Sequence, residues 1–246
     1  MRILIIRHGE PDYNTDSLTK KGRREAQLLA DRLCGMSIDD FYVSPLGRAR
    51  ETARPTLERL GREAVVLDWL QEFRGRAQDP ETGEEAFPWD LMPQRWTKQQ
   101  ELFDPQRWLQ NGFYSSGTIK EVYDETGEAL EGLLASYGYV RCGMLFHTDQ
   151  NLDKTIALFC HFGIGMTMIA HLLGLPLVPL WHGGMMPTTG VTTLFTEERV
   201  KGEVFFRCLQ IGDTSHLYAG REPLSEAGMY RERYEDSDWI DRIHEV

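Results

Sequence analysis

The sequence has 246 residues, which at about 150 residues per domain corresponds to one large domain or two small ones. Hydrophobic residues make up 41% and charged residues 26%, values typical of a folded globular protein, so a disordered chain is excluded. The net charge of −11 argues against nucleic acid or an anionic membrane as a partner, because both require a basic surface. A small anionic substrate is still compatible with this charge, because screening lets a local arginine cluster dominate its own pocket.

Four cysteines, Cys34, Cys142, Cys160 and Cys208, are spread along the chain without the paired spacing of a zinc site. Cys160 and Cys208 lie in apolar runs and are expected to be buried free thiols, which indicates a reducing compartment. The apolar run near the N-terminus is too short for a secretory signal, and no run reaches the length of a membrane span. We therefore expect a cytoplasmic location.

The first third of the chain alternates short apolar runs with amphipathic segments. Residues 2–6, RILII, are typical of a buried strand, because the run is continuous, apolar and β-branched. Residues 18–33 predict a helix that begins at an N-cap, Thr19, and buries one apolar face. In chain order, the elements expected next are a strand at 40–44, a helix from Pro45 through Leu57 and a strand at 65–70.

A similar alternation returns near the end of the chain. The elements expected there are a strand at 154–160, a helix at 165–173 and strands at 191–195 and 203–209. Strands that alternate with helices predict an α/β fold with three layers, α/β/α, around a mostly parallel central sheet. In such a fold, ligands bind at the carboxyl ends of the strands.

Residues 76–150 fit this alternation poorly, and we interpret them as a mostly helical, cap-like insertion in a single domain that covers residues 1–246. The stretch is rich in proline and in aromatic residues, including Trp89, Trp96 and Trp108. These aromatics either pack the insertion onto the sheet or favour a substrate with an apolar or planar part. The acidic segment 222–246 is compatible with a helix, a dimer contact or a frayed tail.

The segment Arg7-His8-Gly9-Glu10 directly follows the first predicted strand, at the end where the fold binds ligands. An arginine side chain offers a planar set of donors to phosphate oxygens, and a glycine lets the backbone approach closely. A neutral histidine is a nucleophile near pH 7. This combination of residue types favours phosphate chemistry.

The sequence resembles the histidine phosphatase superfamily, also called the phosphoglycerate mutase-like family, over nearly its whole length. The matching blocks, in the family's order, are Arg7-His8-Gly9-Glu10, Leu18-Thr19-Lys20-Lys21-Gly22 with Glu25-Ala26, Ser44-Pro45-Leu46-Gly47-Arg48-Ala49, Cys160-His161-Phe162-Gly163 and Gly212-Asp213-Thr214-Ser215-His216-Leu217. In the fourth block, Phe162 replaces a glycine of the family's usual strand-H-G-G pattern. The resemblance implies an α/β fold and phosphoryl transfer.

The resemblance also implies roles for single residues. His8 would attack phosphorus and become a phosphohistidine, while Arg7, Arg48 and His161 would hold the phosphoryl oxygens. Positioning and charge stabilisation of this kind supply most of the rate in phosphoryl transfer.

A leaving alkoxide needs a proton, and the resemblance implies an acidic residue soon after the strand at 65–70. Glu72 matches this position best, with Asp68 and Glu63 as weaker candidates. To donate a proton at neutral pH, Glu72 needs a raised pKa, which burial or nearby charge can provide. Gly9 is expected to let the backbone approach the phosphate, and Asn14 matches a position whose amide contacts phosphate in the family.

Other charged and histidine residues are expected to be structural. Arg23, Arg24 and Glu25 are interpreted as an exposed helix face. Among the remaining histidines, His216 is the one to follow, because it lies in a block that matches the family.

Two enzymatic activities fit these residues: a phosphatase, in which water attacks the phosphohistidine, and a mutase, in which bound product takes the phosphoryl group back. The family's cofactor-dependent mutases have a longer loop after the first block, with a stretch like F-T-G-W, and this chain has only Pro11 to Ser17 before Leu18. We therefore expect a phosphatase that hydrolyses a small phosphomonoester. The alternatives are a phosphoglycerate mutase-type transfer and a non-catalytic phosphate-binding regulatory module.

No cofactor and no metal are expected, because the Asp, Glu and His residues lack zinc-type spacing and His8 would supply the nucleophile. The expected partner is a small phosphorylated substrate. The sequence does not decide the oligomeric state.

Overall fold

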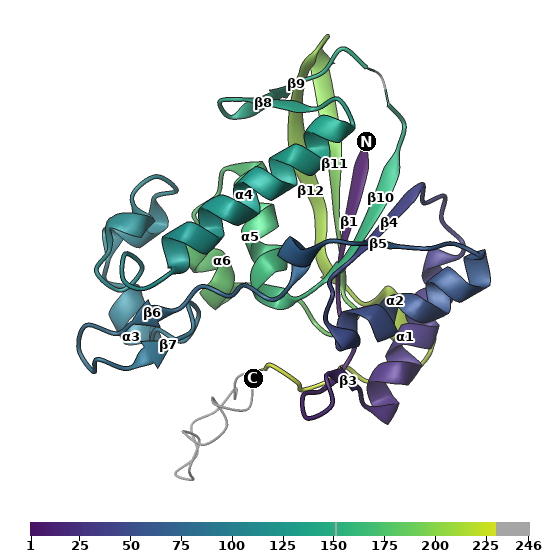
Figure 1. Cartoon of the computed structure of the whole chain (residues 1–246), viewed down its shortest axis with the longest axis horizontal. Helices are drawn as coiled ribbons and strands as arrows, with labels where there is room; N and C mark the ends of the chain where they lie inside the picture. Colours follow the sequence, from purple (N-terminus) through teal and green to yellow (C-terminus); the bar gives the residue numbers. More distant parts are fainter. Residues whose placement is uncertain (151, 230–246) are drawn as a thin grey trace.

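An eight-stranded sheet organises the computed structural model, which describes residues 1–150 and 152–229 (Figure 1). The strands lie side by side in the order β5-β4-β10-β1-β11-β12-β9-β8. Their bounds are β1 Arg2–Arg7, β4 Asp40–Val43, β5 Val65–Val66, β8 Val140–Cys142, β9 Leu145–His147, β10 Thr155–Cys160, β11 Val191–Val200 and β12 Glu203–Asp213. The first strand of the chain thus lies between two strands that come much later in the sequence.

The sheet is parallel on one side of β1 and antiparallel on the other. β5, β4, β10 and β1 are parallel neighbours, whereas β11, β12, β9 and β8 join antiparallel. The turn between β11 and β12 includes Gly202 at φ +83°, and so short a turn connects only antiparallel strands. The expected α/β/α layers around a central sheet are confirmed, and the parallel half carries the strand ends of the predicted site.

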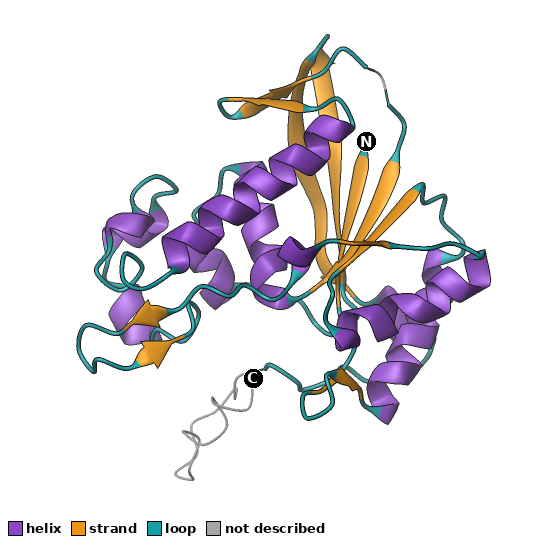
Figure 2. Cartoon of the chain, in the orientation of Figure 1, coloured by secondary structure: helices purple, strands orange, loops and turns teal. Residues whose placement is uncertain are grey.

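Helices cover both faces of this sheet (Figure 2). Their bounds are α1 Lys20–Leu33, α2 Gly47–Leu60, α3 Pro93–Trp96, α4 Ile119–Ser136, α5 Phe162–Leu173, α6 Leu177–Gly183 and α7 Ser215–Ala219. Helices α4, α5 and α6 lie on one side of the sheet, and α1 and α2 lie on the other (Figure 1). None of the helices in the described ranges is long and apolar enough to cross a bilayer.

Successive side chains of β1 point to opposite faces of the sheet and pack in two different core clusters. Ile3 and Ile5 belong to the cluster formed with α4, α5 and α6, whereas Leu4 and Ile6 pack with side chains of α1 and α2. All four side chains are fully buried, as the continuous apolar run predicts for a strand covered on both faces.

Several predicted element boundaries and one predicted burial are wrong. The helix expected from Pro45 begins at Gly47 and continues to Leu60, and the strands expected at 191–195 and 203–209 continue to Val200 and Asp213. The strand expected at 65–70 ends at Val66, because β4 offers no partner beyond Val43, and Asp68–Leu70 form a 3-10 turn instead. The helix expected at 165–173 begins earlier, at Phe162. Cys160 is buried as expected, whereas Cys208 is only half-buried.

Residues 76–150 are less helical than the sequence analysis predicts. Most of their helix lies in α4, and the stretch before it holds short turns, α3 and a hairpin of β6 (Ala77–Gln78) with β7 (Glu85–Ala86). The prolines of this stretch explain the difference, because each one removes a backbone donor and restricts the residue before it. Trp108 is 1% exposed and packs edge-on against Trp181, so it belongs to the core.

The last described residues return to the beginning of the chain, and we call residues 222–229 the C-terminal strap. Glu222 pairs with Lys21 and Arg24 of α1, and Ser225 Oγ donates to Glu10 Oε2 at 2.6 Å. Gly228, at φ +75°, passes so close to Arg7 that a Cβ atom would lie 2.8 Å from its guanidinium. The rest of the acidic tail, residues 230–246, lies outside the described residues.

Candidate active site

Three neighbouring strand ends bring the predicted site residues together. Arg7 pairs with Cys160 at the end of the β1–β10 ladder, so His8 and His161 follow their strands side by side. Val43 pairs with Phe159 in the next ladder, which places Ser44 beside them. The two imidazole rings lie 5.1 Å apart between centroids. The parallel register is therefore what juxtaposes two histidines that are far apart in sequence.

His8 is 2% exposed and its ring orientation is fixed by one hydrogen bond. Its Nδ1 lies 2.7 Å from the Gly9 carbonyl oxygen, and since a carbonyl only accepts, Nδ1 carries the proton. Burial, together with the positive charges of Arg7 and Arg48, holds the pKa of His8 well below its ordinary value. The imidazole is therefore neutral at physiological pH, and Nε2 has a free electron pair.

His161 is fully buried and has one ring nitrogen engaged. Its Nε2 lies 2.8 Å from Ser44 Oγ, while no residue of the described chain pairs with Nδ1. The Ser44 hydroxyl accepts from the Leu46 amide and can donate its own proton to Nε2, which favours the His161 proton on Nδ1. Burial first, and then the neighbouring His8 and arginines, keep the pKa of His161 well below its ordinary value.

Arg7 and Arg48 supply positive charge beside the histidines, and each is held from one side. Arg7 is 3% exposed and its Nη1 donates to the Met186 carbonyl at 2.6 Å. Arg48, in the first turn of α2, donates from Nη1 to Asp16 Oδ1 at 2.7 Å. The Nε atoms of both arginines are buried and lack a partner among the described residues. Buried donors without partners are rare, so these are the groups that a bound anion would satisfy.

Glu72 follows the 3-10 turn and reaches the beginning of α5. Its Oε1 accepts from the Phe73 amide at 2.8 Å and from the Ile164 amide at 3.1 Å. Burial raises the pKa of Glu72, although these two amides and the Arg7 and Arg48 charges oppose the shift. Because Ile164 comes three residues after His161, its amide places Glu72 at the same end of β10 as the histidines. The alternative acids Asp68 and Glu63 are exposed.

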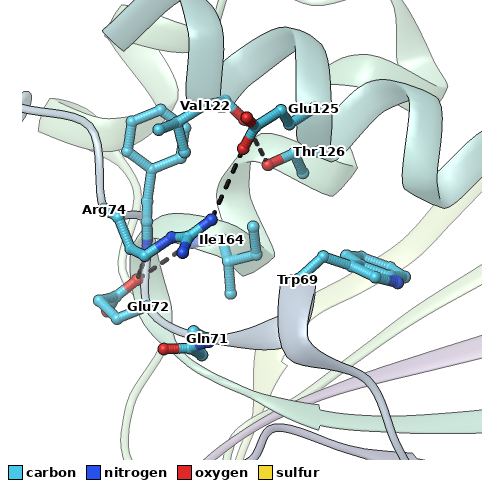
Figure 3. Close-up of a pocket in the computed structure, with 9 residues that line it drawn as sticks. Trp69, Gln71, Glu72, Arg74, Val122, Glu125, Thr126 and Ile164 are labelled. Atoms are coloured by element: carbon cyan, nitrogen blue, oxygen red, sulfur yellow. Dashed lines mark hydrogen bonds and ion pairs between the residues drawn. The ribbon is translucent and has the colours of Figure 1, made fainter. Parts of the chain in front are cut away.

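Glu72 also borders a small pocket between the 3-10 turn, α4 and α5, whose space of about 250 Å³ includes open solvent (Figure 3). On the far side of this pocket, Arg74 points toward Glu125 of α4 and pairs with it at 3.5 Å. Both of these side chains are largely exposed, so the pocket opens toward solvent.

Two predicted phosphate contacts have different surroundings from those expected. The Gly9 amide donates to Thr52 Oγ1 at 2.9 Å, and a Cβ atom at Gly9 would lie 2.9 Å from the Gly22 carbonyl oxygen. The missing side chain thus permits close packing of this loop on α1. Asn14 is exposed between β2 (Pro11–Asp12) and β3 (Ser17–Leu18), where its amide donates to Asp12 Oδ1 at 3.1 Å. Phosphate binding by Gly9 and Asn14 stays a prediction.

The prediction that Glu25 lies on an exposed helix face is wrong, although Arg23 and Arg24 are exposed as expected. Glu25 is fully buried; its Oε2 accepts from the Glu10 amide at 2.8 Å, and Lys21 Nζ lies 3.2 Å from its other oxygen. The sequence pattern does not predict the burial of Glu25, because Glu25 stands in a run of charged residues. Its partner amide comes from the loop after β1.

Two further residues of the site region were missed by sequence reasoning. Asp16, at φ +45°, accepts from Arg48 and also from the Gly47 amide at 2.6 Å. The Tyr13 ring lies 5.5 Å from the Arg48 guanidinium carbon, and its hydroxyl contacts the Arg7 side chain. The only available signal was their place in the short segment between the first two matching blocks.

His216 contacts a residue that is hydrogen-bonded to the backbone of His8. Its Nε2 lies 2.9 Å from Thr189 Oγ1, and Thr189, at φ +55°, donates its amide to the His8 carbonyl at 3.1 Å. Burial lowers the pKa of His216 to about 4, so it is neutral at physiological pH. The residue thus fixes the backbone that holds His8.

The chain is similar in sequence and in fold to known proteins. The sequence profile of the histidine phosphatase superfamily (branch 1) matches residues 3–205. This chain belongs to the histidine phosphatase superfamily. The superfamily match includes His8, Arg48, Glu72 and His161, whereas the C-terminal strap lies beyond it.

Relatives within the histidine phosphatase superfamily carry both phosphatase and mutase names. An adenosylcobalamin/alpha-ribazole phosphatase of Escherichia coli is 27% identical over 74% of this chain and 84% of its own length. A protein of Serratia proteamaculans named probable phosphoglycerate mutase is 30% identical over 72% of this chain and 76% of its own length. A solved phosphoserine phosphatase mutant from Entamoeba histolytica has the same fold, with a TM-score of 0.59 and 23% identity over 88% of this chain and 98% of its own.

In the described part of this superfamily member, no group of three or more His, Cys, Asp or Glu side chains is arranged to hold a metal ion.

Proposed function

We propose that the chain is a phosphatase that hydrolyses a small phosphomonoester through a phosphohistidine on His8. The observation that carries this proposal is a neutral His8, with Nε2 free, beside buried donors on Arg7, Arg48 and His161 that lack partners in the described chain. A tetrahedral anion with several oxygens is the ligand that such donors would bind.

The first step would be attack of His8 Nε2 on phosphorus. The N–P bond forms as the bond from phosphorus to the ester oxygen breaks, and Glu72 gives its proton to the departing oxygen. The guanidinium groups of Arg7 and Arg48 and the Nδ1 proton of His161 would stabilise the charge on the phosphoryl oxygens. Removing one such oriented donor costs about 10²–10³ in rate in other enzymes.

The second step would return the enzyme to its starting state. The Glu72 carboxylate takes a proton from water, the water oxygen attacks phosphorus and the N–P bond breaks. Inorganic phosphate leaves, His8 is again neutral and Glu72 is again protonated. The raised pKa of Glu72 supports both roles, because the group must hold a proton in one step and accept one in the other.

The phosphatase is favoured over the mutase by the segment after Glu10. Pro11 to Ser17 forms only the small β2–β3 hairpin before α1 begins. A mutase must hold its product and exclude water while the phosphohistidine persists, and this hairpin offers little chain for that purpose. The non-catalytic alternative is disfavoured because His8 keeps a free nucleophilic nitrogen.

Mass spectrometry of the intact protein, avoiding acid quench, tests the proposal. The protein is mixed with phosphoserine, α-ribazole phosphate, phosphoglycerates and simple alkyl phosphates, chosen partly from the names of the relatives. Phosphate release with a transient adduct on His8, and loss of both in His8→Ala, is the expected result. An adduct that persists until a phosphoglycerate removes it would establish the mutase. Binding without turnover in both wild type and variant would establish the regulatory module.

The proposed mechanism requires no metal ion, because His8 is the nucleophile and the arginines supply the positive charge. Activity is therefore expected to withstand EDTA. Full loss on chelation, with recovery on adding back a divalent cation, would contradict this part of the proposal.

A further inference from the structure

Aromatic side chains border the site on the side of Glu72, and we propose that they form a subsite for a flat, uncharged ring in the leaving group of the substrate. Phe87, Trp89 and Phe162 make up this surface, which we call the aromatic wall. The inference rests on the proposed function, because it specifies the part of the phosphomonoester that Glu72 would protonate.

The aromatic wall begins next to the phosphoryl-binding side chains. Phe162 directly follows His161, and its ring centroid lies 6.0 Å from the Arg7 guanidinium carbon. Trp89 packs edge-on against Phe162 at 5.7 Å between centroids, and Phe87 stacks on Trp89 at 5.6 Å with an interplanar angle of 22°. Phe87 and Phe162 are half-buried, whereas Trp89 is 8% exposed.

The same wall reaches the proposed acid. A Cβ atom on Gly163 would collide with the Trp89 ring and would lie 2.8 Å from Glu72 Oε1, so ring and carboxyl group meet above this glycine. In-line attack by His8 directs the departing oxygen away from His8 and toward its proton donor. The first atoms of the leaving group would therefore lie along the aromatic wall.

Arg7, the cation next to Phe162, is assigned to the phosphoryl group, and the other cations near this wall are already engaged. Arg76 lies 3.7 Å above the Phe87 ring and donates to carbonyl groups of residues 73–75, which fixes the ring in place. Arg74 pairs with Glu125. A carboxylate on the leaving group would thus have to displace an existing interaction, whereas an uncharged ring gains contact area at once.

Two tryptophans that the sequence suggested for substrate recognition are not part of this wall. Trp108 is buried in the core, and Trp96 stacks on His182 at 5.0 Å and packs against Phe103. Of the three tryptophans, the contacts therefore retain Trp89, which packs against Phe162.

The test compares three substrates with the same kind of primary alkoxide leaving group: 3-phenylpropyl phosphate, propyl phosphate and 3-carboxypropyl phosphate. For the wild type, we expect kcat/KM for the phenylpropyl ester to exceed that for the propyl ester by about tenfold or more, because the ring is removed from water. The carboxypropyl ester should be the slowest. Equal values for the phenylpropyl and propyl esters, or a preference for the carboxylate, would overturn the proposal.

Variants locate the preference on the wall. Trp89→Leu and Phe162→Ala are expected to lower the ratio of phenylpropyl to propyl kcat/KM to within about threefold of one. Phe103→Leu is the matched control, because Phe103 is an aromatic of the same segment that is 44% exposed and packs on Trp96, and it should keep the wild-type ratio. If both wall variants keep the wild-type ratio of phenylpropyl to propyl kcat/KM, the assignment of the preference to these residues is wrong.

A binding measurement separates this inference from the proposed function and does not depend on any variant folding. Wild-type affinity for 3-phenylpropylphosphonate, which resists hydrolysis at the P–C bond, is compared with that for propylphosphonate. Tighter binding of the phenyl compound without turnover of any ester would support the wall and refute the phosphatase. Turnover of all esters with equal phosphonate affinities would support the phosphatase and refute the wall.

Discussion

Asp16 Oδ1 accepts a hydrogen bond from Arg48 Nη1 at 2.7 Å, and this contact joins the β2–β3 hairpin to the first turn of α2. The other oxygen of the same carboxylate accepts from the Gly47 amide at 2.6 Å. Asp16 thus fixes both the guanidinium and the backbone that carries it. Arg48 Nε has no partner in the described chain. Asp16 therefore holds one edge of the guanidinium, and the Nε donor is left for a bound ligand.

Replacement of Asp16 tests whether this contact positions Arg48. Asp16→Ala is expected to raise KM for a phosphomonoester by roughly tenfold while kcat changes less, because binding depends on the oriented guanidinium. Asp16→Asn should recover only part of the loss: asparagine tolerates the φ of +45° and keeps one acceptor oxygen, but its NH2 group cannot accept from the second donor. Steady-state kinetics measures KM and kcat of each variant, and thermal melting measures its stability. An unchanged KM in the alanine variant with a lowered melting temperature would reduce Asp16 to a structural residue.

Removal of the proposed acid should depend on the leaving group. Glu72→Gln keeps an oxygen that can accept from the Phe73 and Ile164 amides but has no proton to give. We expect kcat/KM to fall about 10²–10⁴-fold for an alkyl phosphate and far less for p-nitrophenyl phosphate, whose leaving group departs as the anion. Glu125→Gln, across the same pocket, is the control and should leave both substrates unaffected. An equal loss for the two substrates would remove the acid role from Glu72.

The pH dependence of kcat/KM follows from the two shifted pKa values. Activity needs neutral His8, whose pKa is held low mainly by burial, and protonated Glu72, whose pKa is raised mainly by burial. With an alkyl phosphate, the rate should therefore fall as pH rises through the raised pKa of Glu72, and the loss on the acid side should begin only well below pH 6.5. Glu72→Gln serves as the reference, because substrate ionisation remains in it and Glu72 ionisation does not.

Nitrogen NMR of His8 checks the same assignment directly. At pH 6 the ring should carry one proton, on Nδ1, because the Gly9 carbonyl accepts it at 2.7 Å. A doubly protonated ring at this pH would contradict the role of His8 as a ready nucleophile.

The buried carboxylate of Glu25 should matter for stability. Glu25→Ala leaves the Glu10 amide without its acceptor and removes one of the two carboxylates that pair with Lys21, so we expect a loss of about 2–4 kcal/mol in the free energy of unfolding. Arg23→Ala is the matched change on the same helix and should cost under about 1 kcal/mol, because Arg23 is half-exposed in a surface ion pair with Glu51. Urea denaturation measures both. Equal losses would show that the Glu25 contact contributes nothing beyond a surface pair.

The parts of the site that the sequence predicts are those that follow directly from strand ends. The apolar runs at 2–6 and 154–160 locate β1 and β10, and in a parallel pair the residues after them, His8 and His161, must lie at one edge. Family resemblance then adds Arg48 and Glu72. The positions of these four residues can be predicted from local sequence, because each residue is placed by the strand, turn or helix next to it.

The residues that the sequence does not predict depend on partners from elsewhere in the fold. Glu25 is buried because the Glu10 amide from another loop points at it, and no helical pattern records that amide. Asp16 depends on a left-handed backbone in a hairpin, and Gly9 on the close approach of α1. In each case the deciding interaction is made between elements.

The position of β1 also sets an order of events during synthesis. Its two neighbours in the sheet, β10 and β11, begin at Thr155 and Val191, and the bond from Ser225 to Glu10 spans 215 residues. At roughly 5–20 residues per second, on the order of ten seconds pass at the ribosome between translation of β1 and translation of β10. During this interval the apolar segment at 2–6 has no strand to pair with and is open to wrong contacts. The phosphoryl-binding edge of the sheet can therefore form only late in synthesis, well after its first strand has been made.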